Sequence, residues 1–374
     1  MRTLLQVTFL FLLSFQLSNA QETIIGSFSF DGQERDYRLR IPPATISGER
    51  PLVLNLHGFT SNAWQQEAYS QMNAVADTAG FYVCYPNGIN NAWNVGWTFG
   101  STADDVGFIN ALLDTLIANH GIDPERLYAC GMSNGGFMSY RLACELNDRI
   151  AAVASVTGSM VPAYMGSCTP GRPVPVLEIH GTEDPTVPYT GQAFLAISIE
   201  ELLSFWRANN ECDGDPVVEE LPNTNADDES TVSIIQSTGC TERGEVLHYR
   251  INNGGHTWPG APISLGVTNQ DINGSVEIWH FFRQYTRSGL SSIAAYAGPG
   301  TLDLFPNPAI ERVHVSLPSS GGELSLFNIA GQLIHRQAIQ HKTTELNVSF
   351  CTPGVYWVRV RQGAQVRVGQ LVVQ

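Results

Sequence analysis

A serine flanked by glycines is the strongest chemical signal in the sequence. Residues 131–135 have the order Gly-Met-Ser-Asn-Gly, which is the G-x-S-x-G pattern of a nucleophile elbow. The pattern follows an apolar run, Arg126–Cys130, and precedes an expected helix, Gly135–Glu145. Such a sharp strand-to-helix turn leaves no room for a side chain at its glycines, and it exposes the Ser133 hydroxyl with the Asn134 N–H beside it. We therefore expect Ser133 to be a nucleophile.

Candidate partners for this serine follow it along the chain. A serine hydroxyl needs a base to take its proton, and on such a scaffold the order is Ser, acid, His. Asp184 directly follows a buried strand, which places its carboxylate at the same edge of the sheet as Ser133. Glu183 is the alternative acid, and either residue could instead cap a helix. His256 lies in a loop of sequence Gly-Gly-His-Thr-Trp-Pro-Gly after the final expected strand, so we expect a Ser133, Asp184 and His256 triad.

An acyl-transfer site also needs donors for the negative oxygen of its tetrahedral intermediate, and each donor is worth about 3–4 kcal/mol. The segment Leu56–Thr60 ends the third expected strand, where the second donor loop belongs. We predict an oxyanion hole made by the N–H groups of Asn134 and Phe59, with Thr60 as the next candidate. His57 is expected to order this loop rather than to titrate during catalysis.

The expected loops around this centre are rich in tryptophan: Trp64, Trp93, Trp97 and Trp258. Ordinary core packing is the alternative role for each of them. Trp258 lies two residues beyond the expected base and is predicted to form a wall of the substrate site. Trp93 and Asn94 belong to a polar and aromatic loop that could line an acyl or alcohol pocket. Such a surface suits an aromatic or polymeric ester.

The scaffold that must position these residues is predicted to be an α/β sheet. The chain of 374 residues is 43% hydrophobic and 15% charged, which excludes a disordered chain and suits two folded units. Strand and helix signals alternate from about residue 24 to 286, which predicts a mostly parallel sheet with helices on both faces. The expected strands are Thr23–Phe30 and Asp36–Ile41, forming a hairpin, then Leu52–Leu56, Phe81–Tyr85, Arg126–Cys130, Ala151–Val156, Val174–Ile179 and Val246–Ile251. The expected helices are Ala63–Thr78, Asp105–Asn119, Gly135–Glu145, Ile197–Asn209 and Asp271–Tyr285, with Asp105 and Asp271 as N-caps.

The first 20 residues have the pattern of a secretory signal peptide. Arg2 precedes an apolar run from Leu4 to Leu17, and small residues ending at Ala20 form a cleavage site. A membrane anchor is the alternative, but the run is short and interrupted by polar residues. No later stretch is long and apolar enough to span a bilayer, so we expect no transmembrane segment in the mature chain.

Export to an oxidising compartment makes the cysteines informative. The chain has seven, so at least one stays unpaired. Cys144 and Cys168 flank an expected strand and are one candidate pair. Cys212 and Cys240 bracket an acidic insertion at residues 213–230 and are another. The two cysteines inside apolar strands, Cys84 and Cys130, are expected to be buried thiols. No spacing resembles a zinc site, and neither a metal nor an organic cofactor is expected.

The chain changes character after about residue 288. Residues 288–302 are small and glycine-rich, which predicts a linker, and residues 303–374 hold short alternating runs with glycine turns and no helix signal. That pattern predicts a small β-sandwich. From residue 297 onward six basic and four acidic residues give a net charge of +2, against −15 for the whole chain. The acidic total argues against nucleic acid or an anionic membrane as a partner.

The main module resembles the secreted esterases of the feruloyl-esterase and polyhydroxybutyrate-depolymerase group, an α/β-hydrolase family. The matching blocks span most of residues 24–286 and are Leu56–Gly58, Asp104–Phe108, Gly131–Gly136, His180–Tyr189, Gly254–Gly260 and Asp271–Phe282. The resemblance implies the Ser133, Asp184 and His256 triad in an esterase domain of residues 21–287. It also supports two disulfides, Cys144–Cys168 and Cys212–Cys240.

The tail, residues 303–374, resembles the C-terminal sorting domain of proteins exported by the type IX secretion system. Matching residues are Phe305–Pro308, Leu326–Asn328, Gly331 and Gly354–Tyr356. The resemblance implies recognition by an outer-membrane export machinery, followed by release or attachment at the cell surface. A carbohydrate-binding β-sandwich is the alternative.

These features predict a secreted serine carboxylester hydrolase that works through an acyl-enzyme. A feruloyl or acetyl ester of plant polysaccharide is the preferred substrate, and an extracellular polyester such as polyhydroxybutyrate is the alternative. A serine peptidase or acyltransferase could use the same triad, because fold and triad do not fix the leaving group. A surface protein that kept the fold and binds glycan without catalysis is a further alternative, which the intact triad disfavours.

Overall fold

The computed structural model describes residues 22–43, 48–290, 302–317, 321–328, 333–362 and 365–373. The expected signal peptide and most of the expected linker lie outside the described residues. No helix among the described residues is both long and apolar enough to cross a membrane.

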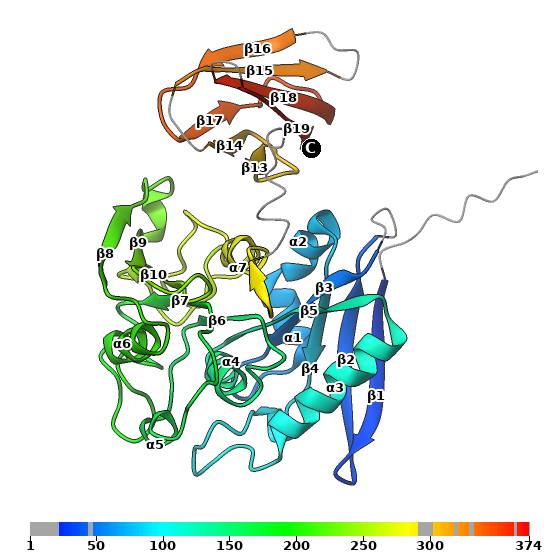
Figure 1. The fold of residues 1–374 in the computed structure, drawn as a ribbon, viewed down its shortest axis with the longest axis vertical. Helices are drawn as coiled ribbons and strands as arrows, with labels where there is room; N and C mark the ends of the chain where they lie inside the picture. Colours follow the sequence, from blue (N-terminus) through cyan, green and yellow to red (C-terminus); the bar gives the residue numbers. More distant parts are fainter. Residues whose placement is uncertain are drawn as a thin grey trace, which may run out of the picture.

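A mixed sheet of ten strands forms the centre of residues 22–290 and has the order β1-β2-β4-β3-β5-β6-β7-β10-β9-β8 (Figure 1). The strands from β4 to β10 in this order run parallel, and antiparallel strands extend both edges. This confirms the predicted α/β class. The strands are β1 (Glu22–Phe30), β2 (Gln33–Ile41), β3 (Arg50–Leu56), β4 (Tyr82–Pro86), β5 (Ile122–Met132), β6 (Ala152–Val156), β7 (Val176–Gly181), β8 (Gly214–Glu220), β9 (Thr231–Thr238) and β10 (Val246–Asn252).

Strands β8 and β9 were not expected from the sequence. Six of the seven residues of β8 are exposed, so it lacks the apolar alternation that signals a strand with one buried face. The acidic insertion at residues 213–230 therefore supplies an edge strand and a short 3-10 helix, η2 (Ala226–Asp228), rather than an unstructured loop.

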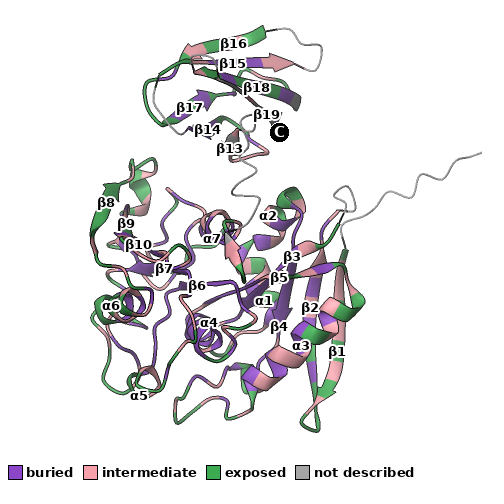
Figure 2. Ribbon diagram, viewed as in Figure 1, coloured by how far each residue is buried: buried purple, intermediate pink, exposed green. Residues whose placement is uncertain are grey.

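Helices cover both faces of the ten-stranded sheet. Their apolar sides join two cores: α3, α4 and α6 pack on one face, and α1, α2 and α7 pack on the other. The central strands are buried between these layers (Figure 2). The helical segments are α1 (Ala63–Ser70), α2 (Met72–Ala79), η1 (Ile89–Asn91), α3 (Asp105–Asn119), α4 (Asn134–Glu145), α5 (Pro162–Met165), α6 (Ile199–Asn209) and α7 (Gly274–Phe282).

The structure corrects three helix boundaries. The expected helix Ala63–Thr78 is broken at Gln71, whose φ of 54° lies in the left-handed region that ends a helix. Asp104, not Asp105, caps α3 and accepts a hydrogen bond from the Gly107 N–H. Helix α7 begins later than expected, with Asn273 rather than Asp271 as its N-cap.

The cysteines confirm both predicted disulfides. Cys144, in α4, is bonded to Cys168, and Cys212 is bonded to Cys240 beside the antiparallel edge of the sheet. Each bond closes a loop and stabilises the fold mainly by restricting the unfolded chain.

The two cysteines on central strands are free and fully buried, as predicted. Burial raises the pKa of both thiols well above the ordinary value, because no charged partner offsets the loss of water around a thiolate. Both groups, Cys84 and Cys130, are therefore protonated members of the apolar core.

The tail is a small β-sandwich, as predicted. Two antiparallel sheets, β13-β14-β17 and β16-β15-β18-β19, share one core of aliphatic side chains. A hairpin, β11 (Tyr285–Thr286) and β12 (Gly289–Leu290), precedes the tail. The tail strands are β13 (Asp303–Phe305), β14 (Arg312–Ser316), β15 (Glu323–Asn328), β16 (Leu333–Ala338), β17 (Thr343–Asn347), β18 (Gly354–Gln362) and β19 (Gln365–Val373).

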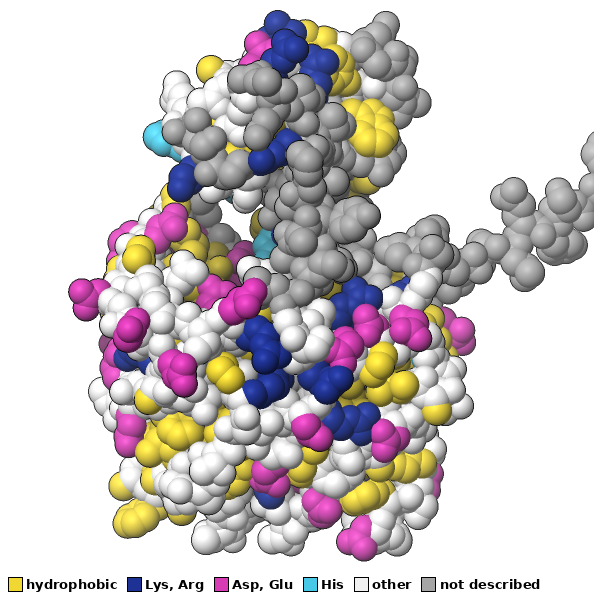
Figure 3. Space-filling view, in the orientation of Figure 1, with side chains coloured by type: hydrophobic (Ala, Val, Ile, Leu, Met, Phe, Trp, Pro, Cys, Tyr) yellow, Lys and Arg dark blue, Asp and Glu magenta, His cyan; other side chains and the backbone are white. Residues whose placement is uncertain are grey.

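On the face shown in Figure 3, acidic side chains are scattered over residues 22–290 rather than gathered in one patch.

A buried ion pair fixes the long loop between β4 and α3. Arg35 on β2 donates to Asp105 across 2.7 Å, and the two side chains are only 2% and 0% exposed. The guanidinium also lies 3.7 Å above the centre of the Phe108 ring. The other carboxylate oxygen of Asp105 accepts hydrogen bonds from the Asn94 N–H and the Ser101 hydroxyl. One carboxylate thus joins the sheet, the helix and the loop.

We expect Asp105→Asn to lower the free energy of unfolding by about 3–5 kcal/mol, because it leaves the buried guanidinium without its counter-charge. Denaturant unfolding of the purified protein measures this loss. Asp114→Asn is the matched control: it removes a carboxylate that also pairs with an arginine but is 66% exposed, and it should cost about 0–1 kcal/mol. Equal effects of the two substitutions would contradict the role given to the buried pair.

Candidate active site

Ser133 lies in a strained turn between β5 and α4. Its φ of 54° and ψ of −122° are a conformation that side chains rarely adopt. Two neighbouring glycines make the turn possible: a Cβ on Gly131 would lie 2.5 Å from the Gly135 carbonyl carbon, and a Cβ on Gly135 would lie 2.1 Å from the Leu56 oxygen. The Ser133 N–H donates to the Val156 oxygen and ties the turn to β6. This is the strand–turn–helix geometry expected of a nucleophile elbow.

His256 and Asp184 meet across two loops that follow β10 and β7. His256 Nδ1 lies 2.7 Å from Asp184 Oδ2, while Asp184 Oδ1 accepts from the Thr186 and Val187 N–H groups at 2.8 Å each. An ionised carboxylate only accepts, so the His256 proton is on Nδ1 and Nε2 is left as the acceptor. Glu183, the alternative acid, is exposed.

Ser133 and His256 line the same cleft, which has a volume of about 460 Å³. The Asp184 side chain is fully buried behind His256, whose own side chain is 17% exposed. The structure therefore brings the three predicted residues to one site, although they are separated by more than 50 residues from each neighbour in the sequence. A nucleophile, a base open to the cleft and a buried acid are the parts that acyl transfer through a serine requires.

The loop after β3 supplies one of the two predicted oxyanion donors. Among the described residues, neither the Phe59 N–H nor the Asn134 N–H donates to another protein group. The Thr60 N–H, in contrast, donates to the Asn91 oxygen at 2.8 Å, so the structure does not support Thr60 as an oxyanion donor. The N–H groups of Phe59 and Asn134 remain the candidate oxyanion donors.

His57 orders this loop, as expected. Its Nδ1 donates to the Gly58 oxygen at 2.8 Å, and its Nε2 accepts from the Gly88 N–H at 3.0 Å. Burial lowers the pKa of His57 to about 4, so the ring is neutral and holds one hydrogen bond of each kind.

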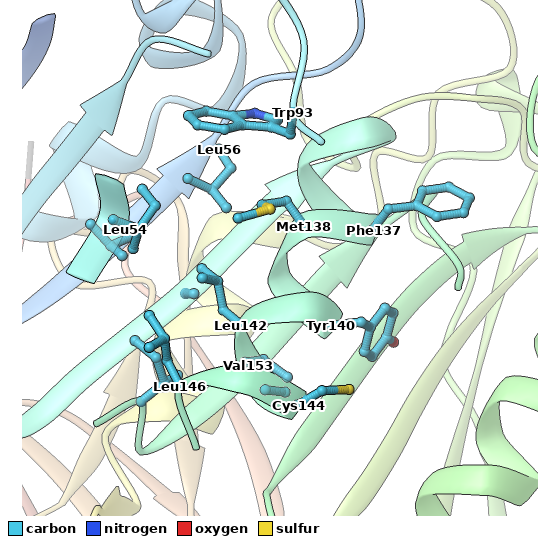
Figure 4. Packing of buried hydrophobic residues seen from close by; sticks show 14 of the residues in the cluster. Leu54, Leu56, Trp93, Phe137, Met138, Tyr140, Leu142, Cys144, Leu146 and Val153 are labelled. Carbon is cyan, nitrogen blue, oxygen red and sulfur yellow. The ribbon is translucent and has the colours of Figure 1, made fainter. Parts of the chain in front are cut away.

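Trp93 was predicted to touch substrate, and the structure contradicts this. Its side chain is 1% exposed and lies in the core beside Leu56 and Met138 (Figure 4). Its indole N–H donates to the His57 oxygen, and its backbone exchanges two hydrogen bonds with the Asn134 side chain. Trp93 therefore connects the two loops that carry the oxyanion donors, without access to the cleft.

Trp258 and Asn94 are also structural. Trp258 is 1% exposed, and its indole N–H donates to the Ser275 hydroxyl at the start of α7. The Asn94 side chain donates to the Ala103 oxygen and stabilises its own loop. Position beside His256 did not predict exposure, because Thr257 and Trp258, which follow it directly, are both buried.

Apart from Phe59 and Trp64, the apolar walls of the cleft come from residues that the sequence did not single out. Trp64 at the start of α1 is 62% exposed, and Ile263 and Leu265 are 62% and 64% exposed. Ala68, Tyr69 and Met132 also line the cleft. Ile263 and Leu265 lie in an irregular loop, where no sequence periodicity distinguishes buried from exposed side chains. Trp64 was among the tryptophans that the sequence singled out around the site.

A second aromatic surface adjoins the cleft at Phe59. The Phe59 ring packs edge-on against Phe99 and Trp97, with ring centres 5.7 and 6.4 Å away. Phe59 and Phe99 are 41% and 45% exposed, so apolar surface continues beyond the cleft. Among the described residues, no group of three or more His, Cys, Asp or Glu side chains is placed to hold a metal ion.

Comparison with known proteins agrees with this geometry. The family described as "Esterase PHB depolymerase" matches residues 35–167, and the "Secretion system C-terminal sorting domain" matches residues 303–374. "Putative esterase NocK" from Nocardia uniformis subsp. tsuyamanensis is 31% identical over 283 residues, which are 68% of this chain and 80% of that protein. "Feruloyl esterase B" from Piromyces equi is 31% identical over 230 residues, which are 57% of this chain and 41% of that protein.

Among solved structures, "Acetyl xylan esterase from Aspergillus awamori" superposes with a TM-score of 0.52 over 69% of this chain and 98% of that chain. At 14% identity this likeness shows the fold, which is that of the α/β hydrolases. Both resemblances noted in the sequence are confirmed by these matches. The chain is a secreted carboxylic ester hydrolase that belongs to the esterase family of the polyhydroxybutyrate depolymerases and feruloyl esterases, and it carries a C-terminal sorting domain.

Proposed function

We propose that the chain hydrolyses esters through Ser133 as nucleophile, His256 as general base and Asp184 as the acid that orients His256. The observation that carries the proposal is the placement of Ser133 and His256 on one cleft, with the Asp184 carboxylate 2.7 Å behind the histidine. This arrangement leaves the unprotonated nitrogen of His256 on the side of the cleft.

In the first half-reaction the Ser133 oxygen attacks the ester carbonyl carbon while His256 Nε2 takes its proton. The Asp184 carboxylate stabilises the imidazolium, and the Phe59 and Asn134 N–H groups donate to the oxyanion. The tetrahedral intermediate collapses as the alkoxide leaves with the proton from His256. In the second half-reaction water attacks the acyl-enzyme, His256 again takes the proton, and the acid product leaves Ser133.

The proposed substrate is a feruloyl or acetyl ester of plant polysaccharide. The names of similar proteins support this class, and the cleft supports the aromatic acyl group: Trp64 offers an exposed ring on one side and Ile263 and Leu265 offer aliphatic surface. A planar aromatic acid fits between such surfaces. A polyester of hydroxyalkanoate is the alternative, because the exposed Phe59 and Phe99 could hold an aliphatic polymer.

For the tail we propose recognition by an outer-membrane export machinery, which the sorting-domain match supports. In this proposal residues 1–20 are a cleaved leader, residues 21–287 the catalytic domain, residues 288–302 the linker and residues 303–374 the sorting domain.

We expect Ser133→Ala to lower kcat/KM for every ester that the enzyme accepts by at least about 10³-fold, because it removes the nucleophile. The measurement compares ferulate release from methyl ferulate with 3-hydroxybutyrate release from the polyester, using the purified protein. Ser61→Ala is the matched control, since Ser61 also lines the cleft and should matter little. Release of hydroxybutyrate alone would show that the substrate is the polyester rather than a feruloyl ester. Activity retained by Ser133→Ala would refute the mechanism.

We expect Trp64→Ala to lower kcat/KM for methyl ferulate about 10-fold and to leave hydrolysis of a short acetate ester nearly unchanged. The reason is that a ring-to-ring contact and its buried area are worth about 1–2 kcal/mol, and only the aromatic substrate can make that contact. Trp357→Ala in the tail, which removes another exposed tryptophan, is the control. Equal losses on both esters would show that Trp64 does not select the acyl group.

A further inference from the structure

A second buried histidine lies behind the acid of the proposed triad. Both ring nitrogens of His180, near the end of β7, face oxygen atoms: Nδ1 is 2.8 Å from Glu178 Oε1, and Nε2 is 2.9 Å from the Val187 oxygen. Nε2 also lies 3.5 Å from Asp184 Oδ2, the atom that His256 Nδ1 approaches to 2.7 Å. The side chains of His180, Glu178 and Asp184 are fully buried.

These contacts restrict where protons can be. A neutral imidazole has one N–H and one lone pair, so it cannot donate to two acceptors. The Val187 carbonyl can only accept, which assigns a proton to Nε2. A second proton must then lie between His180 Nδ1 and Glu178 Oε1, either on the ring or on the carboxyl group. The other oxygen of Glu178 accepts from the Tyr140 hydroxyl at 2.6 Å, a bond that favours the carboxylate form of Glu178.

The charges around the pair support the ionic form. Burial lowers the pKa of His180, but the hydrogen bond and charge of Glu178 and the charge of Asp184 outweigh it and raise the pKa overall. The pKa of Glu178 is raised overall, because its burial outweighs the opposing hydrogen bond and charge of His180; the ionic form therefore rests on the contacts of the pair rather than on this direction. The other ionisable side chains around the pair, from the elements packed against it, are Tyr140, Tyr189, Glu200, Arg207, His248 and Arg250.

The histidine on the neighbouring strand differs from His180 in one decisive way. His248 Nδ1 lies 3.1 Å from the Glu178 backbone oxygen, and its Nε2 lies 3.0 Å from the Tyr189 hydroxyl, which itself donates to Glu200. Among the described residues no carboxylate bonds this ring directly, and burial lowers the pKa of His248 to about 3. His248 is therefore a buried neutral ring, whereas His180 is a buried cation beside Asp184.

We propose that Glu178 and His180 form a buried ion pair that positions Asp184 and moderates the basicity of His256. The inference rests on the proposed roles of Asp184 and His256, and it makes Glu178 and His180 positioning residues. Asp184 Oδ2 is shared by two rings. The cation behind it offsets part of its negative potential, so Asp184 stabilises a proton on His256 less than a carboxylate with no cation behind it would.

The test is Glu178→Gln. The amide keeps the shape of the side chain, its oxygen can still accept from the Tyr140 hydroxyl, and its NH₂ can donate to His180 Nδ1. His180 then becomes neutral, with its proton on Nε2 toward the Val187 oxygen. With the cation gone, His256 holds its proton more tightly. We expect the acidic limb of the kcat/KM profile to move up by about 0.5–1 pH unit, with a smaller effect on the plateau rate.

His248→Asn is the matched control, because it removes a buried ring that contacts the same residue but carries no charge. The acidic limb of the kcat/KM profile of His248→Asn should stay at the pH of the unchanged protein. A purely structural role for Glu178 would make Glu178→Gln lower kcat or raise KM without moving the acidic limb, and that outcome would overturn the inference. If the activity does not depend on Ser133, the proposed function fails instead, so the two failures are distinguishable.

A spectroscopic measurement on the unchanged protein keeps the inference testable if Glu178→Gln does not fold. Nitrogen NMR of ¹⁵N-histidine-labelled protein should show one ring, His180, that keeps both nitrogens protonated at a pH where the other histidine rings have become neutral. A spectrum in which no ring stays doubly protonated after the others have lost their protons would overturn the ion pair. In a folded Glu178→Gln protein the doubly protonated signal should disappear.

Discussion

The close approach of the β5–α4 turn to the end of β3 is the constraint on which the rest of the site depends. The Gly135 backbone lies so near the Leu56 oxygen that a single added carbon would be 2.1 Å from it. This contact places the Ser133 turn beside the loop that carries Phe59, so one packing contact sets both the strained Ser133 conformation and the positions of the two proposed oxyanion donors. Trp93 then holds the two loops together: its indole N–H donates to the His57 oxygen, and its backbone bonds the Asn134 side chain.

The sequence predicted the parts of this site that depend on local backbone geometry. The elbow glycines, the proposed acid Asp184 after β7 and the proposed base His256 after β10 were singled out because each follows a strand, and parallel strands present their carboxyl ends at one edge. The two disulfides were predicted through the family resemblance. Sheet class and most central strands followed from apolar runs, since a strand buried on both faces needs no alternation to be recognised.

Features that depend on tertiary packing were predicted poorly. Trp258 lies two residues after His256, and Trp93 lies in a polar and aromatic loop, yet both side chains are buried in the core. The direction of these loops is set by partners such as Asp105 and Ser275, which bond the Asn94 N–H and the Trp258 indole. The exposed β8 lacks a buried face and so lacks a pattern. Thr60 was a plausible donor until its N–H was seen to bond the Asn91 oxygen. The charge proposed for His180 rests on three contacts, to Glu178, Val187 and Asp184, that no sequence spacing reveals.

The acid and base are held together by the same kind of backbone packing as the elbow. A Cβ on Gly181 would lie 2.2 Å from the Gly254 oxygen, and the Glu183 N–H donates to that same oxygen. The loop after β7 and the loop after β10 are therefore joined by main chain before their side chains meet. Asp184 Oδ1 is already held by two N–H groups of its own turn, so only Oδ2 is available to histidine. His256 accordingly meets a carboxylate whose direction is fixed by the backbone, and the charge behind that carboxylate becomes the remaining variable that can adjust the base.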